Sequence, residues 1–169
     1  MSWENVWALD AVTTEARAEA GPYPFSVAML GKEAGSEKLG FSLWSLSPGA
    51  FNCPYHYHHR EEELFVILSG KGILRQAGQY REVLAGQAVF FKTGEDGVHQ
   101  LYNHGDQPLR YLTVSNKHEA DVCEYPDSDK VLLRGAHRQL YLRSTKVEYM
   151  DGEGDPKRHW SADALEGKV

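Results

Sequence analysis

A cluster of histidines and glutamates that leads directly into an apolar run is the feature that most constrains this chain. Three histidines and three glutamates fall within eight positions, and the apolar run that follows them ends at Gly70. His56 and His58 are two residues apart, a spacing that places both rings on one face of an extended strand. Two neutral imidazoles and a nearby carboxylate form most of a first-row transition-metal site. We therefore predict that this stretch binds a metal ion.

The residues alone do not identify the carboxylate ligand. Glu61, Glu62 and Glu63 all follow His58 closely, and strand alternation does not choose between them because both faces of residues 64–68 are apolar. His59 should point to the face opposite the pair and is interpreted as a surface histidine. The remaining histidines lie in turns or polar segments and are interpreted as bystanders, and they are His104, His118, His137 and His159.

Short strands separated by turns account for most of the chain after residue 38. Residues 39–46 alternate with a period of two, which places Phe41 and Leu43 on one face and Trp44 and Leu46 on the other. Glycine-containing turns separate further expected strands at 63–69, 73–76, 80–84, 88–91, 98–102 and 109–115. Such regular spacing is typical of a β-sandwich or a small barrel. The absence of a long helical period argues against a parallel α/β sheet.

The two ends of the chain differ from this middle part. Thr13 or Thr14 is in position to cap a short helix over residues 15–20, which Gly21 and Pro22 would stop. Towards the other end, further strands are expected at 120–125, 130–134 and 139–143. From residue 144 the sequence is polar and contains glycines, so we expect an extended or partly disordered tail.

Two motifs in this chain resemble those of the cupin superfamily. The first reads His-x-His, then a glutamate, then a glycine after six intervening residues, and it is matched by His56, His58, Glu63 and Gly70, although Gly49 lies one residue further ahead than usual. The second is matched in order by Gly86, Gly94, His99 and Asn103. Lys92 replaces the usual proline, and two extra residues separate Gly94 from His99. The resemblance covers roughly residues 39–116.

The resemblance implies an all-β fold, a cupin-type double-stranded β-helix barrel or jelly roll with short terminal extensions. It implies one domain with an N-terminal arm and first strand at 1–38, a barrel core at 39–116, and C-terminal strands with a polar tail at 117–169. The resemblance also implies that His99, although distant in the chain, lies next to the first motif. The family's spacing to Gly70 favours Glu63 over Glu62 as the carboxylate ligand. The implied metal ligands are His56, His58, Glu63 and His99.

The composition limits the classes of partner. A length of 169 residues suits one domain, and 41% hydrophobic and 25% charged residues are typical of a soluble globular protein. The net charge of −6 argues against a nucleic-acid partner, and no apolar run is long enough to span a membrane. With no secretory signal, and with two cysteines that do not form a disulfide framework, we expect a cytoplasmic protein.

The expected function is that of a metal-dependent enzyme acting on a small polar or carbohydrate-like molecule. The first hypothesis is an activity like that of a sugar-phosphate isomerase. An iron-dependent dioxygenase and a non-catalytic ligand-binding module are the alternatives, because the cupin fold does not determine function. The cofactor is expected to be one divalent transition metal, Mn, Fe, Zn or Ni, and no general base is identified. Apolar residues in both end segments, such as Trp3, Trp7, Leu140 and Trp160, predict a homodimer.

Overall fold

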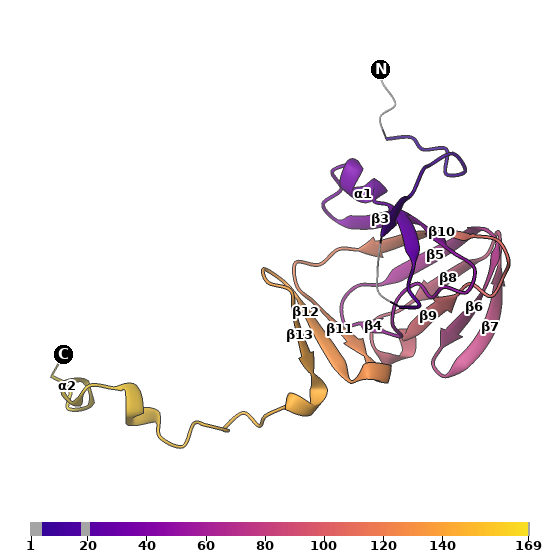
Figure 1. Ribbon diagram of the computed structural model, residues 1–169. Helices are drawn as coiled ribbons and strands as arrows, with labels where there is room; N and C mark the ends of the chain where they lie inside the picture. Colours follow the sequence, from indigo (N-terminus) through magenta and orange to yellow (C-terminus); the bar gives the residue numbers. More distant parts are fainter. Residues whose placement is uncertain (1–4, 18–20, 169) are drawn as a thin grey trace.

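A computed structural model describes residues 5–17 and 21–168 of this chain. Figure 1 shows a β-barrel from which the C-terminal segment extends away. The largest sheet has six strands in the spatial order β1-β2-β3-β10-β5-β8. In chain order these strands are β1 (Glu15–Arg17), β2 (Phe25–Ala28), β3 (Leu39–Leu46), β5 (Glu63–Ser69), β8 (Ala88–Phe91) and β10 (Leu109–Asn116).

Two smaller sheets form the rest of the barrel, with the orders β13-β12-β11-β4 and β7-β6-β9. A bridge between His56 and His99 joins them. Their strands are β4 (Tyr57–His58), β6 (Lys71–Gln76), β7 (Gln79–Leu84), β9 (His99–Tyr102), β11 (Asp121–Tyr125), β12 (Lys130–Arg134) and β13 (Gln139–Leu142). All strand pairs are antiparallel, so the structure confirms the predicted all-β jelly roll.

Helices are short in the described part of the chain. The α-helices are α1 (Leu30–Glu33) and α2 (Ala162–Leu165), and the 3₁₀ turns are η1 (Glu95–Gly97), η2 (Pro126–Ser128), η3 (Arg143–Thr145) and η4 (Pro156–His159). None of the helices in the described ranges has the length and apolar character needed to cross a membrane.

The two faces of β3 bury their side chains in two different places, as its period of two predicts. Leu46 lies in the barrel core, and Trp44 packs against that core. The core consists of side chains from the six-stranded and the three-stranded sheets. Leu43 and Phe41 lie on the other face, in a cluster that includes Trp7 of the N-terminal arm. The sheet therefore separates the barrel interior from a second apolar layer beneath the arm.

The helix expected over residues 15–20 is wrong. Residues 15–17 form β1, an edge strand paired with β2, and residues 18–20 lie outside the described residues. The Thr14 hydroxyl, which had been expected to cap the helix, forms a hydrogen bond of 2.6 Å with the hydroxyl of Ser26 on β2. One or two helical turns are marginal on their own, so pairing with an existing sheet edge is the more stable arrangement.

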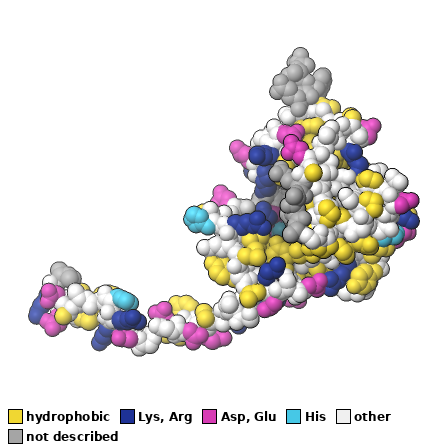
Figure 2. Space-filling view, in the orientation of Figure 1, with side chains coloured by type: hydrophobic (Ala, Val, Ile, Leu, Met, Phe, Trp, Pro, Cys, Tyr) yellow, Lys and Arg dark blue, Asp and Glu magenta, His cyan; other side chains and the backbone are white. Residues whose placement is uncertain are grey.

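The two end segments pack differently. The N-terminal arm folds back onto the barrel, where the Arg110 guanidinium donates hydrogen bonds to the carbonyl oxygens of Leu9 and Val12 at 2.9 and 3.0 Å. At the C-terminal side, Leu140 and Trp160 are 51% and 63% exposed. Hydrophobic side chains also form a band across the lower part of the barrel face in Figure 2. Trp3 lies outside the described residues, and the homodimer and the cytoplasmic location stay predictions.

Asn103 closes the end of the barrel through its side chain. Its amide nitrogen donates to the carbonyl oxygens of Leu46 at 3.0 Å and Gln107 at 2.9 Å, and its oxygen accepts from the Gly105 N–H at 2.9 Å. The residue is completely buried. Asn103 therefore holds the end of β3 and the turn between β9 and β10 together.

We predict that Asn103→Ala lowers the free energy of unfolding, because it leaves buried backbone groups without partners, at a cost of roughly 1–3 kcal/mol each. Urea denaturation followed by circular dichroism measures the change. Gln79→Ala, at an exposed position of β7, is the matched control and should stay within about 0.5 kcal/mol of the wild type. Equal stability of both variants would contradict the assigned role of Asn103.

Candidate metal centre

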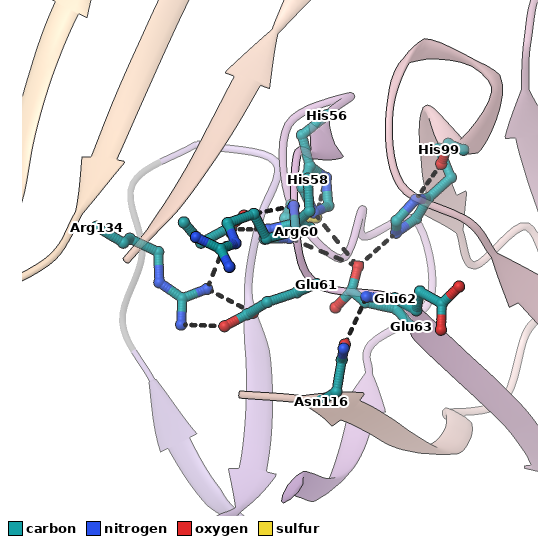
Figure 3. A network of polar contacts seen from close by, with 12 residues as sticks. His56, His58, Arg60, Glu61, Glu62, Glu63, His99, Asn116 and Arg134 are labelled. Atoms are coloured by element: carbon teal, nitrogen blue, oxygen red, sulfur yellow. Dashed lines mark hydrogen bonds and ion pairs between the residues drawn. The ribbon is translucent and has the colours of Figure 1, made fainter. Parts of the chain in front are cut away.

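The four predicted ligands lie on or beside three strands of the barrel. His56 directly precedes β4, His58 lies on β4, Glu63 begins β5 and His99 begins β9. The antiparallel bridge between His56 and His99 brings a first-motif histidine beside one that lies far downstream. Figure 3 shows the Glu63 carboxylate directed towards the imidazoles of His56, His58 and His99. The structure thus brings all four predicted residues together.

The ligand atoms converge on one oxygen of Glu63. The Nε2 atoms of His56, His58 and His99 lie 3.8, 3.6 and 3.2 Å from Glu63 Oε2. Two ligands bonded to one ion at about 2.1 Å lie about 3.0–3.5 Å apart in tetrahedral or octahedral geometry. The ligand atoms of His56, Glu63 and His99 all lie within 4.8 Å of one another, which is close enough to share a single transition-metal ion, and His58 approaches the same carboxylate oxygen.

Each histidine is held by its other ring nitrogen. Nδ1 of His56 and of His99 donates to a backbone carbonyl oxygen, that of Pro54 at 3.0 Å and that of Gly97 at 2.9 Å. Nδ1 of His58 donates to Asp121 Oδ2 at 2.6 Å. A proton fixed on Nδ1 leaves the Nε2 lone pair free to bind a metal. The protein therefore sets the same tautomer for all three imidazoles.

Two buried polar atoms of the cluster have no hydrogen-bond partner among the described residues. They are Glu63 Oε2 and His99 Nε2, which lie 3.2 Å apart without the alignment of a hydrogen bond. Buried polar groups in folded proteins almost always have a partner, or they bind an ion or a cofactor. The donor set consists of three neutral imidazoles and one carboxylate, and it fits a divalent transition metal.

The electrostatics favour the protonation states that a metal requires at His56 and Glu63. Burial lowers the pKa of His56 to about 3, so this imidazole is neutral at physiological pH. Burial alone raises the pKa of Glu63, but the neighbouring imidazoles, His99 first, outweigh it and bring the pKa to about 2. Burial also lowers the pKa of His58, whereas the hydrogen bond to Asp121 and the charge of Glu63 raise it overall. A more basic imidazole is a stronger metal ligand.

The three adjacent glutamates point in three directions. Glu62, the second choice for the ligand, is exposed, and its backbone N–H donates to Asn116 Oδ1 at 2.7 Å. The Glu61 carboxylate is buried and accepts two hydrogen bonds from the Arg134 guanidinium, at 2.8 and 3.1 Å. The carboxylate of Glu63 alone among the three lies between the imidazoles, as Figure 3 shows.

Asp121, like Arg134, is a residue of this site that the sequence analysis missed. It is 2% exposed, and besides its bond to His58 it accepts a hydrogen bond of 2.9 Å from the Arg60 backbone N–H. It begins β11, whose pairing with β4 sets Cys123 opposite His58. The sequence carries no local signal for this contact, because it depends on the register of two strands more than 60 residues apart.

A cavity of about 660 Å³ opens beside the cluster. Its wall contains the first-motif imidazoles together with side chains from β11, β12 and the turn before β13. The lining residues that matter for binding are His56, His58, Cys123, Tyr125, Arg134 and Arg138. Another hollow of about 640 Å³ between β7 and β8 contains none of the four predicted ligands. The first cavity is therefore the candidate ligand site.

Comparisons with known proteins agree with this architecture. A family model described as a cupin domain matches residues 42–115. An oxalate-binding protein of Thermotoga maritima is 33% identical over 87 residues, which cover 51% of this chain and 69% of that protein. Beyond the sequence match, solved structures share the fold.

Two of these structures illustrate the likeness. A candidate sugar phosphate isomerase from Acidithiobacillus ferrooxidans aligns with a TM-score of 0.79 at 24% identity, over 86% of this chain and 96% of the other. A protein of Thermotoga maritima described as a predicted oxalate decarboxylase aligns with a TM-score of 0.56 at 26% identity, over 67% of this chain and 99% of the other.

We predict that Glu63→Gln weakens metal affinity by more than about 100-fold, because loss of an outer partner of a ligand already costs about 10–100-fold. The substitution replaces a charged oxygen donor by a neutral one. Glu62→Gln is the matched control and should bind metal as the wild type does. A competition titration with a chromogenic chelator measures both affinities. If Glu62→Gln is the more damaging change, the ligand assignment is wrong by one residue.

We predict that Asp121→Asn weakens metal affinity by about 10–100-fold, because it removes the charge that holds the proton on His58 Nδ1. The same competition titration measures the loss, and circular dichroism checks the fold. Asp127→Asn is the control, since Asp127 binds Arg75 away from the cluster and is about half exposed. Wild-type affinity in Asp121→Asn would show that Asp121 does not support the ligand.

Proposed function

This chain belongs to the cupin family, and on that premise we propose that it is a metal-dependent isomerase of a small sugar phosphate. One divalent transition-metal ion is held by His56, His58, Glu63 and His99. The observation that carries the proposal is the buried carboxylate oxygen without a hydrogen-bond partner, which faces three Nε2 atoms beside an open cavity. An oxygen-rich ligand in that cavity reaches the cluster from the side of His56 and His58.

The charge of the cluster selects the kind of ligand. The three imidazoles are neutral ligands and Glu63 contributes one negative charge, so a divalent ion leaves a net charge of about +1 by simple addition. When bound, the ion supplies Lewis-acid polarisation of a carbonyl group. A small molecule with adjacent carbonyl and hydroxyl oxygens and a negative charge suits this environment.

The cavity offers proton donors to such a ligand. Burial raises the pKa of the Cys123 thiol to about 12 and also raises the pKa of the Tyr125 hydroxyl, so both keep their protons at neutral pH. Tyr125 lines the cavity and can donate a hydrogen bond to a substrate oxygen. This hydroxyl is the residue best placed to hold a carbonyl oxygen while a proton moves between neighbouring carbons.

A second candidate is the binding of an oxalate-like dicarboxylate without turnover. Two observations favour it. The relative from Thermotoga maritima that is 33% identical is named as an oxalate-binding protein. In the described part of the chain no carboxylate lines the cavity, because Glu61 is bound to Arg134 and Asp121 to His58. Isomerisation would therefore have to take its base from the substrate or from water.

A turnover and a binding measurement on the same metal-loaded protein test the proposal. We expect nuclear magnetic resonance to show conversion of an aldose phosphate to the ketose phosphate, with loss of that activity after chelation. His56→Ala together with His58→Ala should abolish metal content while the circular dichroism stays that of a β protein. Stability should fall without unfolding, because the barrel has its own apolar core.

The outcomes separate the candidates. Tight calorimetric binding of oxalate with no turnover of any aldose phosphate supports the second candidate and contradicts the first. Stoichiometric metal in the double variant contradicts the metal site itself. Activity that survives complete removal of metal would contradict metal dependence.

A further inference from the structure

One guanidinium at the mouth of the cavity has no hydrogen-bond or ion-pair partner in the part of the chain that the structure describes. Arg138 lies in the turn between β12 and β13, is exposed, and lines the same cavity as His56 and His58. It forms no ion pair or hydrogen bond within residues 5–17 and 21–168. Arg134, at the end of β12, differs because its guanidinium is held by the Glu61 carboxylate through two hydrogen bonds.

The charges around the cavity are otherwise balanced. Glu61 is paired with Arg134, and Asp121 with His58. Burial raises the pKa of the Tyr125 hydroxyl, and the positive charge of Arg138 opposes that rise, so the guanidinium lies within electrostatic reach of this ring. The unpaired positive charge at the mouth is therefore that of Arg138, and it adds to the net charge of the metal cluster.

We propose that Arg138 is the specificity-determining residue that binds the phosphate group of the substrate, while the other end of the substrate reaches the metal cluster. This inference rests on the proposed function. A guanidinium presents a planar fork of N–H donors that matches phosphate oxygens and always carries its charge. A cavity of about 660 Å³ has room for a small sugar phosphate between the turn and the imidazoles.

The position of Arg138 supports this role over a structural one. Its side chain is exposed and ties no strands together in the described ranges, so its replacement should leave the barrel intact. The turn that carries it joins two strands of the outer edge of the four-stranded sheet, as Figure 1 shows. Changes in this turn can alter ligand choice without moving the metal ligands.

The test compares Arg138→Gln with Arg138→Lys and with Arg143→Gln. Arg143 pairs with Glu124 at 3.1 Å and does not line the cavity, so it controls for loss of an arginine from the same part of the chain. Calorimetry on the Mn²⁺-loaded proteins uses ribose 5-phosphate, ribose and oxalate as ligands. Metal content and circular dichroism should be unchanged in all three variants.

We expect Arg138→Gln to weaken ribose 5-phosphate binding by about 10–100-fold, the size of a lost charge-assisted hydrogen bond. Arg138→Lys should keep part of the affinity, and Arg143→Gln all of it. Ribose and oxalate should bind Arg138→Gln nearly as they bind the wild type, because neither places an anionic group away from the metal.

Two results would overturn the inference about Arg138 alone. One is wild-type affinity of Arg138→Gln for ribose 5-phosphate. The other is an equal loss for oxalate, which would mean that Arg138 acts only through its general positive field. If the metal-loaded wild type binds no ribose 5-phosphate at all, the proposed sugar-phosphate function fails, and the role of Arg138 fails with it.

Discussion

A carboxylate oxygen buried among three imidazoles, with no hydrogen-bond partner in the described part of the chain, is the constraint on which the rest of this structure depends. Leaving a charged group in such a place is costly unless a cation or a set of hydrogen bonds compensates it. The backbone around Glu63 supplies neither to Oε2. The same arrangement is favourable once a divalent ion lies between the carboxylate and the Nε2 atoms, so the cluster is suited to hold an ion.

The surroundings of the cluster follow from that constraint. Each imidazole must present Nε2, so each Nδ1 needs an acceptor, and the structure provides two backbone carbonyls and one carboxylate. The acceptors at His56 and His99 are local, two residues away along the chain. The acceptor at His58 comes from β11, which makes the pairing of β4 with β11 part of the metal site.

The sequence could predict those strands that show a local periodicity of two residues. The two-residue spacing of His56 and His58 and the alternation along residues 39–46 each report a strand, and both hold in the structure. His99 came from the resemblance, since no local pattern links it to the first motif. Asp121 and Arg134 escaped prediction because their contacts depend on strand register. The helix expected over 15–20 failed because an available sheet edge outweighed weak local propensity.

The three adjacent glutamates have different surroundings although they lie in one short segment. Residues 59–62 lie between β4 and β5, outside strand geometry, so successive side chains need not alternate. Glu61 turns inward to Arg134, Glu62 outward to solvent, and Glu63, already on β5, joins the imidazoles. Family spacing could select the ligand, but only the folded chain shows that its neighbour Glu61 anchors the wall of the cavity.

The predicted metal ligands and several residues of the cavity wall lie in different parts of the chain. The four predicted metal ligands all lie within residues 42–115, the part that matches the cupin domain model. Beyond residue 115 lie Asp121, which orients His58, and the cavity residues Tyr125, Arg134 and Arg138. The predicted ion site therefore lies in the region common to the family, whereas part of the cavity wall, with Tyr125, Arg134 and Arg138, lies outside it. Likeness in the barrel core alone cannot determine which small molecule this site accepts, because several side chains of the cavity wall lie beyond the matched region.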